Sequence, residues 1–482
     1  MNRIFLIIIL VFLFKNFSFE QEQLGLHLEN HSGINAISVN PSNSFLTSYS
    51  WDFNIASAGV FFKNDYAFAK NTNTLKIVNH LKTLNFQIDS SYQENNYAPE
   101  LLAIDFYNRK KESYVVFSGN MTGPSISIKL NKKSSIGFIS RLRFLGGTSK
   151  IPLELNYYTF YNRPFSQTFQ LSEINAGFIS WQEYGINSVQ QIQSYPFIAL
   201  LGATVKYLSG NEAMYFKLKS GALFKQLHGD SLAISDRFNL EYGYTNTSIN
   251  SNRLKFKNNG FGLGLDIGAT FVLGEKLNDY KFRLGISILD LGFIRFNNNS
   301  STYKINVDST TVVDLNQFKE IRQLSDLESI NAKLSSEILK NSDKSFDKNS
   351  FNLMTPTALS VQIDYSISKL FYIQAFLLQR IKPRNQAVTR PNIFAISPRI
   401  EHRWFSFSPS MVIYDWKAIH LGTSIRLAYL IIGSDNLSGL IKDIPEYTGS
   451  DIYVGLKFNP LALGRKNKYG KNLNRKIKCY KF

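Results

Sequence analysis

The sequence predicts an all-β protein, a transmembrane antiparallel β-barrel of about 14 strands with a helical loop insertion. Three observations predict it. The chain begins like a secreted protein, apolar and polar residues alternate along many segments, and no apolar segment after residue 20 is long enough for a transmembrane helix. Aromatic residues make up 14% of the 482 residues, with 39 Phe and 25 Tyr against 5 Met, a bias that favours strands over helices.

The first residues have the layout of a secretory signal peptide. A basic residue, Arg3, precedes an unbroken apolar run at positions 4–14, and Lys15 follows the run. The run is too short to span a bilayer as a helix, and Lys15 interrupts the longer span that the alternative, an N-terminal membrane anchor, would need. We therefore expect residues 1–20 to be a signal peptide that is removed from the mature chain.

A segment near the middle of the chain shows the strand pattern most clearly. From Phe261 to Leu273, apolar side chains occupy every odd position, while Gly, Asp and Thr occupy most even positions. Successive side chains of a strand point to opposite faces, so one face is apolar and the other is polar. The pattern resumes from Tyr280 to Ile288 after a turn, which predicts a long hairpin.

The same alternation also occurs in soluble sheets, where the apolar face points inward. The signal peptide, the length of the strands and the aromatic residues at segment ends favour a membrane barrel, whose apolar face meets lipid. We expect the barrel to occupy residues 51–458, with the polar face lining the lumen. The candidate lumen-facing residues are Arg141, Arg143, Glu241, Asp266, Lys281 and Arg283.

Three segments fall outside the strand pattern. Residues 21–50 precede the first strand near Trp51. At 297–353, apolar residues recur at spacings of three and four, which predicts short helices in a long loop; strand parity leaves open which side of the membrane it faces. Residues 459–482 contain many basic residues and no acidic one. Because such charges are costly on a lipid face, we expect the strand at 451–458 to close the barrel near Trp51 and the basic tail to stay outside the sheet.

Several stretches, taken in their order along the chain, resemble a family of Gram-negative outer-membrane barrels of unknown function. That family is itself similar to long-chain fatty-acid transporter (FadL-like) and PorV-like barrels. The stretches are 33–41 (GINAISVNP), 123–125 (GPS), 203–210 (ATVKYLSG), 260–269 (GFGLGLDIGA), 283–292 (RLGISILDLG) and 433–437 (GSDNL). The similarity extends from Leu24 to Phe458.

The resemblance implies a location in the cell outer membrane and an N-terminal segment that can fold into the lumen. Asn35, Asn40 and Pro41 are the candidate residues of this lumen segment. The resemblance does not supply a substrate. Residues 459–482 depart from the family pattern, because family members tend to end soon after the strand that ends here at Phe458.

The sequence offers no convincing catalytic or cofactor site. His31 and Ser32 are adjacent and would point opposite ways in an extended segment, and His420 and Ser424 are too far apart along a strand to form a hydrogen-bonded pair. The single cysteine, Cys479, excludes a disulfide framework. We therefore expect no enzyme activity, no cofactor and no metal site.

The net charge of +18 could indicate nucleic acid, but it accompanies a secretion signal, so contact with lipid phosphates or acidic surface polysaccharide fits better. The alternative is that these charges are simply solvated. We predict a passive channel or transporter for small or hydrophobic molecules. The alternative is a non-transporting barrel that serves surface attachment, secretion or structure. The expected partners are outer-membrane lipid, the outer-membrane assembly machinery, and either a hydrophobic small molecule or a secreted protein.

Overall fold

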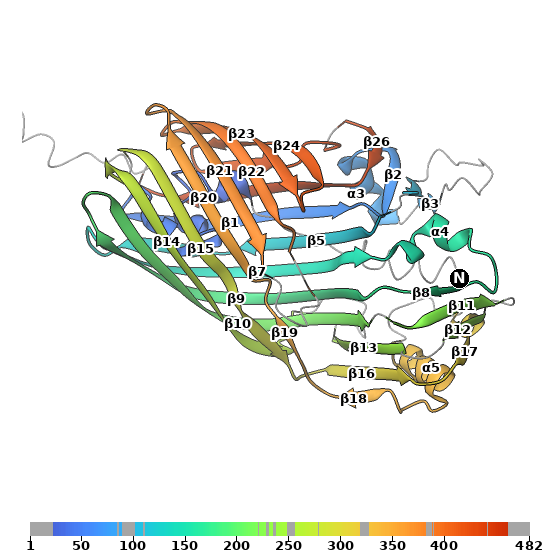
Figure 1. Ribbon diagram of the computed structural model, residues 1–482. Helices are drawn as coiled ribbons and strands as arrows, with labels where there is room; N and C mark the ends of the chain where they lie inside the picture. The colour runs from blue at the N-terminus through green and yellow to red at the C-terminus, as the bar shows by residue number, and fades with distance from the viewer. Residues whose placement is uncertain are drawn as a thin grey trace, which may run out of the picture.

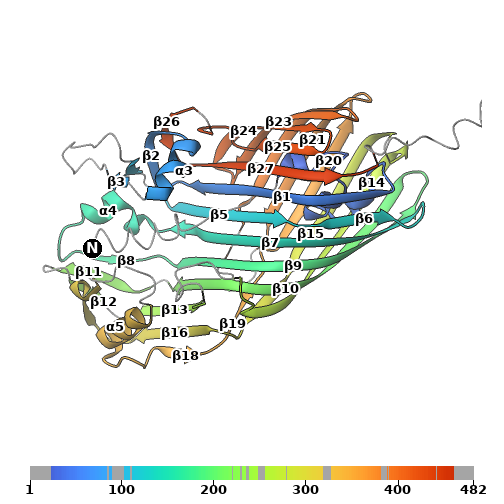
Figure 2. The same cartoon turned by 180° about the vertical axis from the view of Figure 1, so that it is seen from behind.

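The computed structural model describes residues 23–460, apart from 84–85, 89–101, 109–110, 220, 228–230, 235–237, 248–255, 278, 319–326, 382–387, 389 and 441. Within this part of the chain, 14 antiparallel strands form a closed barrel, seen from two sides in Figures 1 and 2. This confirms the fold class that the alternating pattern predicts. None of the described helices is both long and apolar enough to cross a membrane.

The wall strands follow one another around the ring in chain order, with β5 and β6 counting as one interrupted strand. They are β1 (Trp51–Asn64), β5 (Ser113–Thr122) with β6 (Ser125–Lys129), β7 (Ser134–Ile151), β9 (Ile174–Gln193), β10 (Ile198–Leu218), β14 (Gly260–Lys276), β15 (Asp279–Phe296), β20 (Ala358–Ser366), β21 (Phe371–Arg380), β22 (Ile393–Glu401), β23 (Phe405–Tyr414), β24 (Ala418–Leu427), β25 (Leu430–Ser434) and β27 (Gly449–Phe458).

The ring closes between its first and last strands. Phe53 of β1 pairs with Phe458 of β27, and Val60 pairs with Ile452. The predicted closure of the barrel by residues 451–458 is therefore confirmed. Residues 461–482, which hold most of the basic tail, lie outside the described residues.

The two ends of the barrel differ in the length of their connections. One end has short turns, including 130–133, 194–197, 367–370, 402–404 and 428–429. The other end, which we call the long-loop end, carries the connections 65–112, 152–173, 219–259, 297–357, 381–392 and 435–448. Strand parity thus places the 297–353 segment at the long-loop end, which the sequence left open.

The long connections fold into further strands and short helices. Strands β13 (Phe238–Thr245), β16 (Ser300–Val307), β18 (Phe346–Lys348) and β19 (Phe351–Met354) extend the wall beyond β10 and β15. Two small sheets contain β8 (Thr168–Gln170), β11 (Leu223–Leu227), β12 (Ser231–Ile234) and β17 (Thr311–Asp314), and β2 (Ala67–Thr72), β3 (Phe86–Ile88), β4 (Leu102–Phe106) and β26 (Ile444–Tyr447). The helices here are α3 (Thr74–Thr83), η3 (Leu153–Leu155), α4 (Tyr157–Tyr161), η5 (Leu315–Phe318) and α5 (Leu327–Leu339).

The 297–353 segment differs in part from the helical loop that its spacing predicts. It contains η5 and α5, but also the four strands β16 to β19. The extended strand β13 supplies an edge with which β16 pairs along its whole length, from Phe238↔Val307 to Thr245↔Ser300. Pairing with this edge satisfies the backbone hydrogen bonds of β16, so the local helical spacing does not decide its structure.

The outer face of the wall is apolar, as lipid requires. On β14, Phe261, Leu263 and Ile267 are each more than half exposed, while Asp266 between them is buried on the opposite face. The exposed apolar residues continue around the ring and include Val205, Ile288, Ile363, Phe407, Leu421, Ile432 and Val454. The protein is therefore a membrane-type barrel with an apolar exterior and a polar interior.

The orientation of the β14 side chains toward lipid predicts the effect of placing a charge on the outer wall. Ile267→Arg is expected to cost about 2–4 kcal/mol of folding free energy in a bilayer, because position 267 lies near the middle of β14 and faces lipid. Phe261→Arg, at the end of the same strand, should cost about 0–1 kcal/mol. Urea titration of each variant folded into lipid vesicles measures both, and equal stabilities would contradict the assigned facing.

Candidate functional site: the plugged lumen

Residues 23–46, which we call the plug, fill the lumen. The plug consists of α2 (Leu24–His27), η1 (Gly33–Ser38) and η2 (Pro41–Phe45), joined by turns. These helices contact strands from many parts of the ring: α2 meets β24 and β25, η1 meets β1 and β6, and η2 meets β7, β9, β10 and β14. A segment that touches the ring on so many sides lies inside it, and the blue plug is seen within the barrel in Figures 1 and 2.

Glycines on the inner face of the wall make room for the plug. A Cβ atom at Gly202 of β10 would lie 2.4 Å from the Ser42 backbone nitrogen and 2.6 Å from the Pro41 carbonyl carbon. A Cβ at Gly268 would lie 2.2 Å from Asn40 Oδ1. Real Cβ atoms do not approach backbone atoms this closely, so position 202 accepts only glycine while the plug is docked, and a side chain at position 268 would displace the Asn40 amide. Gly202 of β10 and Gly268 of β14 thus form a recess for the N-terminal segment.

The candidate lumen residues of the N-terminal segment all contact the wall. Asn40 caps η2 by accepting the Ser42 N–H at 3.0 Å, and its amide donates to Gln362 Oε1 at 3.0 Å. The Pro41 carbonyl accepts from Asn187 Nδ2 at 3.0 Å. Asn35 donates to Asn54 Oδ1 at 3.1 Å. The structure therefore places Asn35, Asn40 and Pro41 at the plug–wall boundary.

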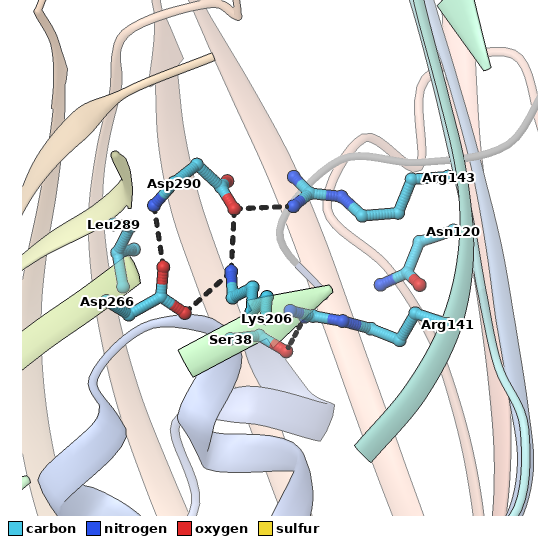
Figure 3. Close-up of a pocket in the computed structure, with 8 residues that line it drawn as sticks. All are labelled: Ser38, Asn120, Arg141, Arg143, Lys206, Asp266, Leu289 and Asp290. Atoms are coloured by element: carbon cyan, nitrogen blue, oxygen red, sulfur yellow. Dashed lines mark hydrogen bonds and ion pairs between the residues drawn. The ribbon is translucent and has the colours of Figure 1, made fainter. Parts of the chain in front are cut away.

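Seven buried charged residues meet at the middle of the lumen, and we call them the central ion cluster. They are Arg141, Arg143, Glu183, Lys206, Asp266, Asp290 and Arg390. Asp290 holds three cations, with its carboxylate 2.8 Å from Arg143 Nη1, 2.8 Å from Lys206 Nζ and 3.2 Å from Arg390 Nη1. Figure 3 shows most of these side chains converging on a cavity of about 10 Å³, enough for one water.

The central ion cluster also contacts the plug. Arg141 Nη1 donates to Ser38 Oγ at 2.7 Å, beside its ion pair with Glu183, as Figure 3 shows for Ser38. Asp290 has a positive φ of 53°, and its N–H donates to Asp266 Oδ1 at 2.7 Å. Asp is one of the few residues that adopt this backbone conformation readily, so its position in the β15 irregularity is consistent with its sequence.

A second set of buried charges lies where the plug turns between α2 and η1. Asp364 Oδ2 pairs with Arg283 Nη2 at 2.5 Å and with Arg399 Nη2 at 2.6 Å. Asn30 of the plug accepts from Arg283 Nη1 at 2.9 Å. Glu29 of the plug accepts from the hydroxyls of Ser406 and Ser408 and from Arg426 Nε. Lys457 pairs with Asp52 at 2.9 Å.

The plug also carries a histidine in this region. Burial, and next the nearby Arg426, lower the pKa of the His31 imidazole to about 4. The ring is therefore neutral at neutral pH while the plug is docked, which avoids adding another buried cation beside Arg426 and Lys457.

The candidate lumen-facing residues fall into three groups. Arg141, Arg143, Asp266 and Arg283 are buried in the charge clusters described above. Glu241 is half-buried on β13, in the extension of the wall, where its carboxylate accepts from Tyr215 Oη at 3.0 Å.

The expectation that Lys281 faces the lumen is wrong, because this residue lies on the outer side of the wall. It is exposed, and its Nζ lies 4.6 Å from the ring centre of Tyr365, an exposed residue of β20. The register between β14 and β15 shifts here, with Leu273 opposite Phe282 but Gly274 opposite Tyr280. Lys281 is the extra residue of this bulge, so the strict alternation on which its assignment rested does not continue through it.

An apolar layer lines the lumen between the plug and the long-loop end. Its wall residues are Phe61, Tyr114, Val116, Leu289, Ala358, Phe376, Leu378, Ile393, Ala395, Val412 and Tyr414, which pack on Leu24, Leu28 and Val39 of the plug. Most of them lie at the ends of their strands that lead into long connections. A second apolar cluster packs on the plug residues Phe45 and Leu46. The polar middle of the lumen is therefore bounded by apolar layers.

Sequence reasoning missed most of the charges that surround the plug. Glu183, Lys206, Asp290 and Lys457 are each the single charged residue among their nearest neighbours in a strand, whereas Arg399 lies two positions from Glu401 in β22. An isolated charge at an inward-facing position is the signal that could have found them, because a single charge inside a membrane barrel needs a partner from another strand.

The described residues bring together no group of three or more His, Cys, Asp and Glu side chains that could hold a metal ion. His420 Nδ1 lies 3.2 Å from Asn436 Oδ1. The arrangement of the lumen is thus one of buried ion pairs and hydrogen bonds that hold a peptide segment in a barrel.

Residues 45–435 match the family described as "Family of unknown function (DUF5723)". The chain belongs to this family. The match confirms the resemblance to a barrel family of unknown function, and it covers most of the chain. No curated protein matches the sequence.

Several solved structures are similar to this DUF5723 protein in fold. The Pseudomonas putida toluene transporter TodX is 9% identical, with 91% of this chain and 94% of that chain covered and a TM-score of 0.38. The CymD monoaromatic hydrocarbon channel is 8% identical over 89% and 92%, with a TM-score of 0.30, and a Pseudomonas aeruginosa FadL homologue is 8% identical over 88% and 94%, with a TM-score of 0.26. Likenesses this distant give no information about a substrate, and the barrel architecture follows from this chain's own strand pairing.

Proposed function

We propose that this protein is a gated outer-membrane channel for small hydrophobic molecules, with the plug as its gate. The observation that carries the proposal is a plug that fills a wide lumen and is held there by hydrogen bonds, ion pairs and packing. Contacts of this kind can be broken and remade, so the same barrel has a closed state with the plug docked and an open state with the plug displaced.

The width of the barrel supports a passage. An eight-stranded barrel is filled by the side chains of its own strands, and larger barrels leave space inside. Here 14 strands enclose a lumen that takes a segment of the chain in addition to the wall side chains. A barrel that served only as an anchor would not need this lumen.

The apolar layer supports hydrophobic molecules as the class of solute. A water-filled porin has a polar interior. In this lumen, residues such as Phe376, Leu378 and Val412 are almost fully buried against one another and against Leu28 of the plug. When the plug withdraws, these side chains become the lining that a molecule from the long-loop end meets first.

The connections support a location in the outer membrane. Barrels of that membrane have short periplasmic turns and long external loops. By this rule the long-loop end faces the exterior, and the short turns face the periplasm. A hydrophobic molecule would then enter at the folded outer loops and leave past the plug.

A reversible lock on the plug tests the proposal. Ser42 Oγ and Thr270 Oγ1 lie 2.7 Å apart, so cysteines at these two positions are within bridging range. In planar bilayers, a Cys479→Ser barrel that keeps Ser42 and Thr270 should show intermittent single-channel openings. Oxidation of the Ser42→Cys/Thr270→Cys variant should abolish the openings, and a reductant should restore them.

Uptake separates the channel from the non-transporting alternative. Cells that carry the reduced variant should accumulate a hydrophobic fluorescent probe faster than cells that carry the oxidised variant. If the locked and the reduced barrels give identical currents and identical uptake, the plug is not a gate, and the protein is better explained as a surface-attachment or secretion accessory.

A further inference from the structure

The wall binds the backbone of the plug as well as its side chains. Buried acceptors on the wall take plug N–H groups, and buried donors on the wall reach plug carbonyls. The plug N–H groups that donate to the wall are those of Leu24 to Asp435 (3.2 Å), Gly25 to Tyr453 (3.0 Å), Asn30 to Glu401 (3.2 Å) and Ile34 to Asp52 (3.0 Å). The plug carbonyls that accept from the wall are those of Ser32 from Lys457 (2.9 Å), Val39 from Ser287 (2.7 Å) and Pro41 from Asn187 (3.0 Å).

Backbone N–H and C=O groups are common to peptides of almost any sequence. A site that binds them is therefore a peptide site in the general sense, with side-chain pockets adding specificity. The groups that make these contacts come from strands around the ring, including β1, β9, β15, β22 and β27. An extended surface of this kind is a different site from the apolar layer.

The wall groups are held in place by other parts of the wall. Glu401 is paired with Arg399 Nε at 2.5 Å, and Asp52 is paired with Lys457 at 2.9 Å. These ion pairs are almost completely buried and orient the carboxylates toward the plug. A preorganised site loses little freedom when it binds, which favours affinity for a ligand that arrives from outside.

The plug itself shows the chemistry of the ligand. Its side chains at Leu26, Ile34, Ile37 and Val39 are fully buried, and Glu29 is its single acidic residue. Glycine, asparagine and proline supply its turns. The lumen thus accepts an apolar peptide of low charge that folds into short turns.

We propose that the lumen is a peptide-binding site that takes an apolar, weakly charged peptide segment of another protein when the plug withdraws. The plug is then the built-in occupant of this site. The plug runs into β1 at the short-turn end, so a peptide enters from that end, where residues 47–50 leave the lumen. This inference goes beyond the channel function, because a bound peptide keeps the lumen closed.

Binding in trans tests the proposal on the full-length chain. The substitutions Ile34→Asp and Ile37→Asp place charges in buried plug positions and weaken the chain's own plug, while every wall residue stays native. A fluorescent synthetic peptide with the sequence of residues 23–46 should bind this variant, and its anisotropy should rise with barrel concentration. The oxidised Ser42→Cys/Thr270→Cys barrel, whose plug cannot leave, should show no binding.

Two altered peptides separate backbone recognition from side-chain recognition. An ester in place of the amide at Leu24, Asn30 and Ile34 removes three N–H donors without adding bulk, and should weaken binding by about 100-fold or more, because three wall acceptors lose their partners. A peptide that carries Ser38→Ala keeps the backbone groups and loses one side-chain hydrogen bond, from Arg141, which keeps its ion pair with Glu183; it should bind within about tenfold of the parent.

The proposal is overturned if the parent peptide does not bind a variant that shows the heat-modified mobility of a folded barrel, or if the ester peptide binds as tightly as the parent. If the double variant is not recovered in the folded state, Ile37→Asp alone weakens the docking of the plug by a smaller amount and replaces it in the assay. The peptide assay involves no current, so its outcome is independent of whether the same barrel conducts.

Discussion

Gly202→Ala is expected to raise the fraction of time for which the barrel conducts ions. The added Cβ would lie 2.4 Å from the Ser42 nitrogen and 2.6 Å from the Pro41 carbonyl carbon, which are backbone atoms of η2 and cannot rotate away. Overpacking of this kind costs about 1–3 kcal/mol, and here the cost falls on the docked plug alone. The measurement is single-channel current in planar bilayers, where the open fraction should rise by about 5-fold to 150-fold.

Gly264→Ala is the matched control in the neighbouring strand. A Cβ at Gly264 would meet only the Leu208 and Lys206 side chains at 3.4–3.6 Å, which is ordinary van der Waals contact. This variant should stay closed. If both variants conduct alike, the effect comes from a disturbed wall and not from the plug. If neither conducts and proteolysis shows the plug still docked, the glycine recess at Gly202 is not what admits η2.

Asp290→Asn is expected to be the most destabilising single change in the lumen. Asparagine adopts the positive φ of this position about as readily as aspartate, so the substitution removes the charge without straining the backbone. Arg143, Lys206 and Arg390 would lose their shared partner while remaining buried. Breaking a buried ion pair on one side costs about 3–5 kcal/mol. The free energy of unfolding, from urea titration of the barrel in lipid vesicles, should fall by that amount.

An exposed pair provides the comparison. Asp347 pairs with Lys304 at 3.0 Å in the outer extension, where both side chains are in contact with solvent. Asp347→Asn should change the free energy of unfolding by about 0–1 kcal/mol. Equal losses in the two variants would mean that the central ion cluster is hydrated and that burial does not set its contribution.

The wall of the barrel could be predicted from the sequence because it depends on a local pattern. Alternation along β14 identifies Phe261, Leu263 and Ile267 as lipid-facing, and the structure places them there. The closing strand was also predictable, since 451–458 alternates cleanly and the tail after it is too charged to face lipid. Both inferences use only the period of a strand and the cost of a charge in lipid.

The contents of the lumen could not be predicted in the same way, because they depend on register between distant strands. Arg143 meets Asp290, a partner far along the chain, only through the pairings that place β7, β10 and β15 around the ring. The alternation within a single strand does not indicate which residue of another strand lies beside Arg143. Lys281 shows the complementary limit, because one extra residue at a bulge ends the alternation from which its facing was inferred.

The glycines of β14 show that one spacing pattern can have two physical causes. Their period-two spacing suggests close approach and curvature of strands, and Gly262 does lie against the backbone of its neighbour β15. Gly268, however, lies against Asn40 of the plug. The sequence shows that something comes close to these positions, but not whether it is the next strand or another segment inside the barrel.

The pairing of β1 with β27 also has a consequence for the order of folding. The two strands that seal the ring are the first and the last to be synthesised, so their contact has the largest sequence separation in the barrel. Contacts of this kind form slowly, because the entropy cost of ordering a long stretch of chain comes before the stabilisation that the contact provides. Until β27 is complete, β1 has an unpaired edge that can associate with other chains. Insertion therefore has to wait for the whole chain, and a nascent chain that stalls before Gly449 remains an open, aggregation-prone sheet.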